Sequence, residues 1–238
     1  MRLCYTASMY YYSRAEAGRK LAAKLLEYQT KNCAIIALSP GAVLVGAQIA
    51  IKLHSNLMML TTENIEIPGE NSPYGAINEA NILTYNNSFS TGEIEEFNME
   101  YFNLIEQQRL QKVQKLHRLM DANGQVRREL LKNHVVIVVA DGLSSGLSLD
   151  VAGDYLKPIR VQKLIAVCPV ASPQAVDRMR LFSDEVHCLS VTENFVETNH
   201  YYEDNTIPSK EGLYKIIRNI SLSWDRPDSA NVRTAPIR

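Results

Sequence analysis

The sequence predicts an α/β fold in which a central, mostly parallel sheet carries helices on both faces. The first observation is that strand-like apolar runs alternate with helical patterns in the second half of the chain. These segments are 135–139, 147–157, 163–168, 173–181 and 186–190. The second observation is that the strand-like runs are mainly apolar, as expected for strands buried on both faces. Because strands separated by helices usually pair in parallel, the two observations together predict the fold class.

The first half of the chain supplies the remaining elements of this sheet. Segment 14–28, RAEAGRKLAAKLLEY, repeats small and apolar residues at helical spacing and predicts an amphipathic helix. The apolar run 33–38 ends at Ser-Pro-Gly and predicts a buried strand. We expect a helix over 43–53, whose small residues allow close packing on that strand, and a second strand over 57–65.

Two segments depart from the alternation. Segment 66–90 is rich in Pro, Gly and Asn, which predicts loops and short edge strands. Segment 91–120 predicts one long polar helix with an apolar stripe, which makes it a candidate dimer surface. A last helix is expected over about 210–219. We therefore expect one domain over 1–222 and a poorly ordered C-terminal tail over 223–238.

Composition argues against several kinds of protein. The 238 residues are 46% hydrophobic and carry a formal net charge of −1, which gives no general attraction to nucleic acid. No apolar run approaches the roughly 18 residues of a membrane span, and the N-terminus has no apolar signal segment. The five histidines and four cysteines show no metal-ligand spacing. We expect a cytoplasmic protein that contacts no membrane and does not have nucleic acid as its main partner.

The stretch VVIVVADGLSSGLSLD, residues 135–150, is the strongest candidate for a binding site. A buried strand ends at Asp141, and ligands of open parallel sheets bind beyond the carboxyl ends of the strands. Gly142 and Gly146 allow backbone conformations that aim successive N–H groups into one cup, where a helix begins. Further hydroxyl donors are Ser144, Ser145 and Ser148. The pattern indicates a cradle for a single phosphate, with Asp141 beside it for sugar hydroxyls, or a plain turn whose polar residues cap the helix.

The stretch resembles the phosphoribosyl diphosphate (PRPP) loop of type I phosphoribosyltransferases. In that family an apolar strand is followed by two acidic residues, small residues and a helix. Other segments are similar, in the same order, to a bacterial subgroup of predicted phosphoribosyltransferases. These are YYSRAEAGRKLAAKL, IIALSPGAVLVGAQIA, IPGENSPYGAI, LIAVCPVASPQAVDRM and DEVHCLSVTENFVETNHYY. The match covers roughly residues 11–220 and implies the type I phosphoribosyltransferase fold with a small hood.

The resemblance also implies a role for each part of the site. The residues expected to bind the 5-phosphate are Gly142, Leu143, Ser144, Ser145, Gly146 and Ser148. Asp141 would hold the ribose hydroxyls and ligate Mg²⁺, the expected cofactor. The segment expected to bind the diphosphate is Ser39, Pro40, Gly41 and Ala42. Segment 199–202 would meet the acceptor base, unless its aromatic residues only pack the hood.

Three departures from the family pattern weaken the expected PRPP site. Ala140 replaces the first loop acid and removes charge-assisted hydrogen bonds worth roughly 1.5–3 kcal/mol each. Pro40 stands where the family usually has Arg, and Ala42 where it has a second Gly, so a cation and a backbone donor are missing. Glu63 and Asn64 replace a basic pair and would add repulsion to the diphosphate.

Two functions remain open. The first is transfer of a 5-phosphoribosyl group from PRPP to a nitrogenous base, at reduced activity, with Mg²⁺ bridging the diphosphate and pyrophosphate leaving. Ser144 occupies the position of the general base in the family's 6-oxopurine enzymes, which disfavours that chemistry. The second is a non-catalytic binding or regulatory protein that senses a nucleoside or sugar monophosphate. A homodimer is expected, and the basic residues of segment 109–118 fit a solvated helix face or a partner contact.

Overall fold

The core of the protein is a five-stranded parallel sheet in the order β3-β2-β7-β8-β9. The computed structural model describes residues 10–119 and 126–224. The core strands are β2 (Cys33–Ala37), β3 (Asn56–Met59), β7 (Val135–Val139), β8 (Lys163–Ala171) and β9 (Glu185–Val191). Both β2 and β7 are buried along their whole length, as their uninterrupted apolar runs predict.

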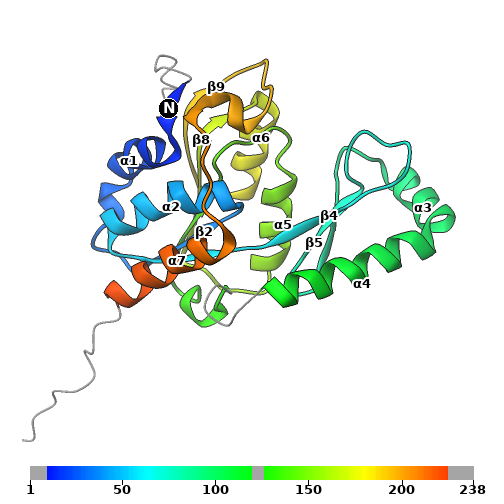
Figure 1. Cartoon of the computed structure of the whole chain (residues 1–238), viewed down its shortest axis with the longest axis horizontal. Coiled ribbons are helices and arrows are strands. Elements are labelled where there is room, and N and C mark those ends of the chain that lie inside the picture. The colour runs from blue at the N-terminus through cyan, green and yellow to red at the C-terminus, as the bar shows by residue number, and fades with distance from the viewer. Residues whose placement is uncertain (1–9, 120–125, 225–238) are drawn as a thin grey trace, which may run out of the picture.

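Helices cover both faces of this sheet (Figure 1). One face carries α1 (Arg14–Lys24), α2 (Pro40–Leu53) and α7 (Lys210–Trp224), and the other carries α5 (Leu147–Leu156) and α6 (Pro173–Phe182). Successive strand residues alternate between the two faces, so that Ile35 packs with the first set and Ile36 with the second. Short 3₁₀ turns are η1 (Leu26–Tyr28) and η2 (Arg128–Leu130). The predicted α/β class is confirmed.

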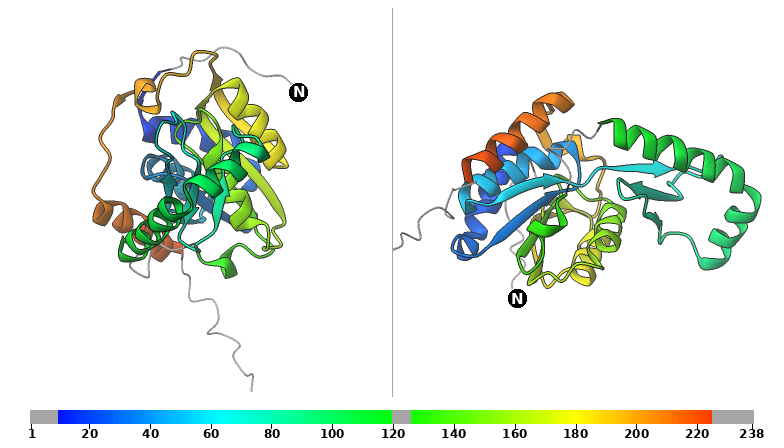
Figure 2. Two further views of the ribbon diagram at one scale, coloured as in Figure 1. Left: turned by 90° about the vertical axis from the view of Figure 1, so that its right-hand side faces the viewer. Right: turned by 90° about the horizontal axis from the view of Figure 1, so that it is seen from below.

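An arm projects from the core between β3 and β7 (Figures 1 and 2). It contains an antiparallel sheet of β4 (Thr62–Ile65), β5 (Gly75–Asn78) and β6 (Leu83–Tyr85), packed against α3 (Thr91–Glu100) and α4 (Phe102–Leu119). The arm has its own small core of buried side chains, which are Ile65, Ile67, Tyr74, Ile77, Ile105 and Leu116. The short strands expected within 66–90 are therefore present.

Two long elements expected from the sequence are each divided in the arm. The single strand expected over 57–65 is wrong, because the chain leaves the core sheet after Leu60 and joins the arm sheet as its apolar run turns polar. The single helix expected over 91–120 is also wrong. It is broken at Tyr101, whose ring packs beside Phe97 while α4 folds back over the arm sheet.

The hood consists of two short parallel strands, β1 (Tyr11–Ser13) and β10 (Tyr202–Asp204), and the 3₁₀ turn η3 (Thr198–Tyr201). Tyr11 pairs with Tyr202 in this strand pair, and both side chains are buried against Val170 of the core sheet. Three-residue strands are too short for a periodic pattern, so the sequence does not predict them. The hood brings residues from near both ends of the chain to one edge of the core.

The C-terminal end of the domain is α7, which runs to Trp224. The domain boundary expected between residues 222 and 223 falls within this helix, and segment 225–238 lies outside the described residues. The division into a domain and a tail therefore stays a prediction. Across residues 10–119 and 126–224, no helix combines the length and the hydropathy needed to cross a membrane.

Candidate functional site

Ser39 and Asp141 are brought together by the register of two neighbouring strands. Ala37 of β2 pairs with Val139 of β7, so the second residue after each strand stands at the same level. There the Ser39 hydroxyl donates a hydrogen bond to Asp141 Oδ1 over 2.7 Å. Both residues lie at the carboxyl end of the sheet, the edge where ligands of parallel sheets bind.

The other carboxylate oxygen of Asp141 binds Arg14, the first residue of α1. Arg14 Nε donates to Asp141 Oδ2 over 2.8 Å, and the exposed fractions of the two side chains are 2% and 10%. Removing one partner of a buried ion pair costs about 3–5 kcal/mol, because the other charge is left uncompensated. Both carboxylate oxygens of Asp141 are therefore engaged by the protein itself.

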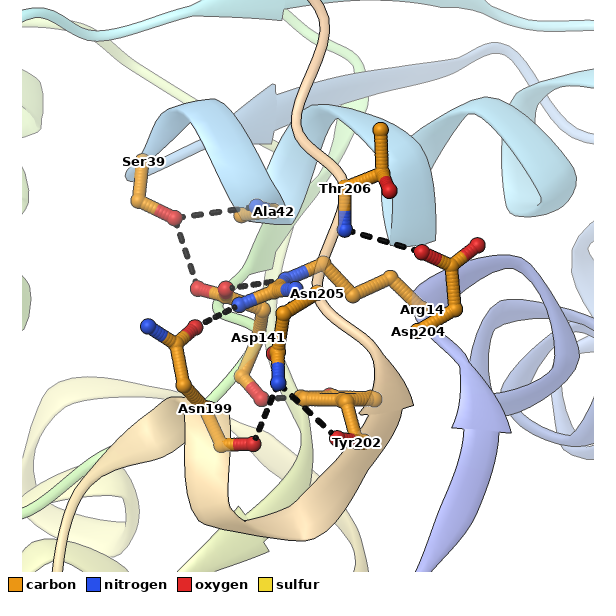
Figure 3. A network of polar contacts seen from close by, with 9 residues as sticks. All are labelled: Arg14, Ser39, Ala42, Asp141, Asn199, Tyr202, Asp204, Asn205 and Thr206. Atoms are coloured by element: carbon orange, nitrogen blue, oxygen red, sulfur yellow. Dashed lines mark hydrogen bonds and ion pairs between the residues drawn. The ribbon is translucent and has the colours of Figure 1, made fainter.

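The hood holds the Arg14 guanidinium from the other side (Figure 3). Nη2 donates to Asn199 Oδ1 over 2.6 Å, and Nη1 donates to Asn205 Oδ1 over 3.3 Å. The guanidinium carbon lies 4.5 Å from the centroid of the Tyr202 ring. The Tyr202 hydroxyl donates to the backbone oxygen of Asp141 over 2.6 Å, and burial raises the pKa of Tyr202, which keeps this donor protonated. This network joins α1, the end of β7 and the hood.

Gly41 provides the space that the ion pair needs. A Cβ atom at this position would overlap the Asp141 carboxylate and stand 2.5 Å from Arg14 Nε. The backbone of α2 can therefore lie directly against the pair only because residue 41 has no side chain.

The segment expected to bind diphosphate is the beginning of α2. Ser39 is the N-cap, and its hydroxyl oxygen accepts a hydrogen bond from the Ala42 N–H over 2.9 Å. Pro40 stands at the first helical position, where an N–H would have no partner within the helix. The helix start expected at residue 43 is therefore wrong, because Ser39 and Pro40 together begin the helix three residues earlier. The assignment of residues 39–42 to diphosphate stays a prediction.

Residues 142–148 present several unpaired backbone donors. We call this segment the phosphate loop, after the ligand that its sequence leads us to expect. Gly146 adopts a φ of 86° and is the N-cap of α5, a conformation that glycine reaches without steric cost. In the part of the chain that the structure describes, the N–H groups of residues 144–148 donate no hydrogen bond to a protein acceptor. Ser144 and Ser145 are exposed to solvent. Unpaired N–H groups at the start of a helix are suitable donors for an anion.

Leu143 anchors this loop to the core and does not present a donor to a ligand. Its N–H donates to the Val170 carbonyl over 3.1 Å, its carbonyl accepts from the Ser172 N–H over 2.9 Å, and its side chain is 3% exposed. Gly142 lies against the hood, because a Cβ atom there would stand 2.6 Å from the Thr198 hydroxyl oxygen. The loop is thus fixed at its beginning and open in its middle.

The sequence does not identify Arg14, Thr198 or Asn205 as members of this site. Arg14 and Asp141 are 127 positions apart, and no motif or periodicity connects them. The sequence indicates Asn199 only as part of a segment expected to meet the base, whereas its side chain accepts a hydrogen bond from Arg14. These residues meet through the pairing of β1 with β10, which the sequence does not reveal.

The structure shows what surrounds two of the residues that depart from the family pattern, Ala140 and Glu63. Ala140 is 4% exposed and its side chain belongs to the apolar cluster that includes Val138 and Leu149. Glu63 lies in the arm and forms an ion pair of 2.6 Å with Lys115, which compensates the charge that we expected to repel diphosphate.

Three basic residues of α4 bind the arm itself. Besides the Lys115–Glu63 pair, Lys112 Nζ donates to the Asn64 carbonyl and Arg109 Nε donates to Asn81 Oδ1 over 3.0 Å. These three cations therefore hold the helix on the arm sheet, and only part of their charge faces solvent.

The fold and the site define an α/β domain whose central strand ends in a loop rich in unpaired N–H groups. The sequence profile of the family described as phosphoribosyl transferase domain matches residues 8–205. This chain belongs to that family, and the predicted type I phosphoribosyltransferase fold is confirmed.

Two kinds of similar protein add detail. A protein of Mycobacterium tuberculosis, provisionally named a phosphoribosyl transferase, is 23% identical over 200 residues, which are 83% of this chain and 44% of that protein. This chain thus spans less than half the length of the curated relatives that it matches. The solved structure of TT1426 from Thermus thermophilus has a TM-score of 0.69 and 23% identity, covering 88% of this chain and 98% of that one. The purine phosphoribosyltransferase of Pyrococcus horikoshii has a TM-score of 0.40 and 15% identity, covering 74% and 81%.

Members of the family generally use Mg²⁺ with PRPP, but the donors of this site do not fit a Mg²⁺ ion held by the protein. Mg²⁺ requires nearly octahedral oxygen ligands at about 2.0–2.1 Å. Asp141, the expected ligand, already binds Arg14 and Ser39 through its two oxygens. Within the described ranges, no group of three or more His, Cys, Asp or Glu side chains is placed to hold a metal ion. A metal ion at Asp141 would therefore compete with Arg14 and Ser39 for the carboxylate.

Proposed function

We propose that this chain binds a 5-phosphorylated ribose on the phosphate loop and transfers the phosphoribosyl group from PRPP to a nitrogenous base at a low rate. Family membership supports the class of reaction. The observation that carries the binding is the run of unpaired N–H groups over residues 144–148, at the start of α5. Such donors hold the negative charge of a phosphate without help from a basic side chain.

The proposed reaction is a displacement at C1 of the ribose. The base nitrogen forms a bond to this carbon, the bond from the carbon to the diphosphate oxygen breaks, and pyrophosphate leaves with the electron pair. The base nitrogen loses its proton in the same process. The phosphate loop would contribute by fixing the 5-phosphate, and hence the ribose, in one position. Ser144 carries no charge and cannot take the proton as a carboxylate would, which is consistent with slow turnover.

A sensor of nucleoside or sugar monophosphates is the second candidate, and the closed surroundings of Asp141 favour it. The carboxylate expected to accept bonds from ribose hydroxyls is engaged by Arg14 and Ser39, and Ala140 supplies no replacement. Both features weaken the hold on the ribose hydroxyls, which PRPP and a monophosphate share. The diphosphate, which only PRPP carries, meets Pro40, a residue with neither a cation nor an N–H to offer. The ligand class on this reading is ribose 5-phosphate or a nucleoside 5-monophosphate.

One pair of assays separates the two candidates. Calorimetric titrations compare ribose 5-phosphate with PRPP, and a pyrophosphate-release assay follows PRPP with a panel of bases. We expect the monophosphate to bind more tightly than PRPP and turnover to be slow. Turnover of about 1 s⁻¹ or faster, the lower end of typical enzyme rates, would identify an ordinary transferase. Binding of the monophosphate without any turnover would identify a sensor.

A charge reversal on the phosphate loop tests the binding part of the proposal. Ser145→Glu places a carboxylate at an exposed position of the loop, so it should repel a phosphate without disturbing the fold. We expect ribose 5-phosphate to bind about tenfold more weakly or worse, which corresponds to about 1.4 kcal/mol. The matched control is Ser88→Glu, an exposed serine in the arm. Equal affinities in the two variants would contradict binding on this loop.

A further inference from the structure

We propose that Arg14 is a built-in cation of this site, so that the chain binds PRPP without using a divalent metal ion. The inference rests on the proposed function, because it concerns the same ligand in the same site. It is drawn from the contacts of Asp141, the acid that the family resemblance assigns to ribose and Mg²⁺.

The Asp141 carboxylate is packed on three sides. Arg14 Nε binds Oδ2 at 2.8 Å, the Ser39 hydroxyl binds Oδ1 at 2.7 Å, and Gly41 lies so close that a Cβ atom would overlap the carboxylate. A hydrated Mg²⁺ ion needs open space as well as free oxygen lone pairs, since it usually keeps several of its water ligands. Each oxygen of Asp141 already accepts one hydrogen bond, and the side chain is 10% exposed, so little open space is left beside it for such an ion.

Arg14 is held too firmly to give way to a metal ion. All three guanidinium nitrogens donate hydrogen bonds, to Asp141, Asn199 and Asn205, and the group lies over the Tyr202 ring. The side chain is 2% exposed and arginine stays protonated, so its positive charge is permanent and sheltered from water. Moving it would leave that charge without partners inside the protein.

The positive charge of Arg14 therefore already balances the negative charge of Asp141. A divalent cation bound at Asp141 would lie close to a fixed guanidinium and would be repelled by it. The phosphate loop itself binds through N–H groups and needs no metal. Arg14 thus takes the place that a metal ion would fill beside Asp141.

The test compares PRPP binding with Mg²⁺ and with EDTA, using ribose 5-phosphate as a reference ligand for the phosphate loop. For each ligand taken separately, we expect the affinity for wild-type protein to be the same with Mg²⁺ as with EDTA. An affinity for PRPP that is about tenfold or more higher in Mg²⁺ than in EDTA, the scale of typical coupling between two ligands, would overturn the inference. Binding of ribose 5-phosphate in the same experiment would still support the proposed function. If ribose 5-phosphate bound in neither buffer, the proposed function would fail and this inference with it.

Variants of Arg14 give a second readout. Arg14→Met removes the cation and frees one oxygen of Asp141, so we expect PRPP binding to become dependent on Mg²⁺. Arg14→Lys keeps a cation beside Asp141 and should retain binding that does not depend on the metal. Arg19→Met, an exposed arginine of the same helix, is the control and should match wild type. Indifference of a folded Arg14→Met variant to Mg²⁺ would contradict the role of Arg14, and if that variant does not fold, the wild-type titration decides.

Discussion

Ala140 and Asp141 are neighbours in the chain with opposite surroundings. The Ala140 side chain lies in the apolar cluster beneath α5, whereas the Asp141 carboxylate meets Arg14 and Ser39. Side chains of an extended segment alternate between faces, so a carboxylate at residue 140 would enter the apolar cluster. The missing acid of the family pattern is therefore consistent with the packing of this chain.

Ala140→Asp should lower stability without improving the site. We expect a loss of at least about 1–3 kcal/mol in the free energy of unfolding, because the new carboxyl group is buried without a hydrogen-bond partner. PRPP affinity should not rise. Denaturant unfolding and calorimetry measure the two effects, and Ala140→Ser serves as a smaller polar control. A variant as stable as wild type that binds PRPP more tightly would show that residue 140 reaches the ligand.

For single residues, the sequence predicts a site whose members are adjacent in the chain, but it does not predict contacts between residues far apart in the chain. The strand, the acid and the Gly-Ser turn of residues 135–148 are adjacent in the chain, so their chemistry can be interpreted directly. The partner of Asp141 comes from the start of α1 and reaches it only through the tertiary fold. The sequence therefore indicates the phosphate loop but not that Asp141 is already paired.

Among the elements, prediction succeeds where composition changes at the element boundaries. The alternation over residues 135–191 is confirmed because β7 and most of β8 are apolar and buried, and each helix begins with a turn residue or a cap. The edge strand β9 mixes apolar with polar residues and is mostly half-buried. It fails at residues 57–65, where one continuous extended segment passes from one sheet to another. It fails again at Tyr101, where no Gly or Pro marks the break and the packing of the arm decides it.

Glu79 lies where the arm meets the core. Its carboxylate accepts long hydrogen bonds of 3.4 Å from the N–H groups of Thr61 and Val126, and the residue is 8% exposed. His117 of α4 contacts its backbone oxygen at 3.0 Å. Burial raises the pKa of Glu79 from 4.5 to about 7, while the two N–H groups and His117 offset only part of this effect. The junction is therefore sensitive to the charge on this one residue.

Stability should fall as the pH rises through the pKa of Glu79. The folded protein retains the proton up to about pH 7, whereas the unfolded chain releases it near pH 4.5, so stabilisation present below pH 4.5 is lost as the pH rises through about 7. At 1.36 kcal/mol per pKa unit, the loss is on the order of 3 kcal/mol. Glu79→Gln should remove this loss in unfolding experiments across the pH range, and exposed Glu95→Gln should not. Parallel pH profiles for Glu79→Gln and wild type would contradict the assignment.

In the molecule as a whole, one buried network connects regions that are far apart in the chain. Arg14 follows β1, Asn205 follows β10, and Asp141 follows the central strand β7, so the network fixes the hood against the core sheet. The arm stands apart from this network and carries exposed apolar side chains, including Met99, Phe102 and Leu110. The homodimer expected from the apolar stripe of segment 91–120 stays a prediction.

A crystal structure of the protein with ribose 5-phosphate bound tests the proposed site most directly. We expect the phosphate to lie over the N–H groups of residues 144–148 and Arg14 to remain bound to Asp141. A phosphate bound elsewhere would contradict the proposed site. A ligand that draws Asp141 away from Arg14, to bind ribose hydroxyls or a metal ion, would contradict the closed, metal-independent site described above.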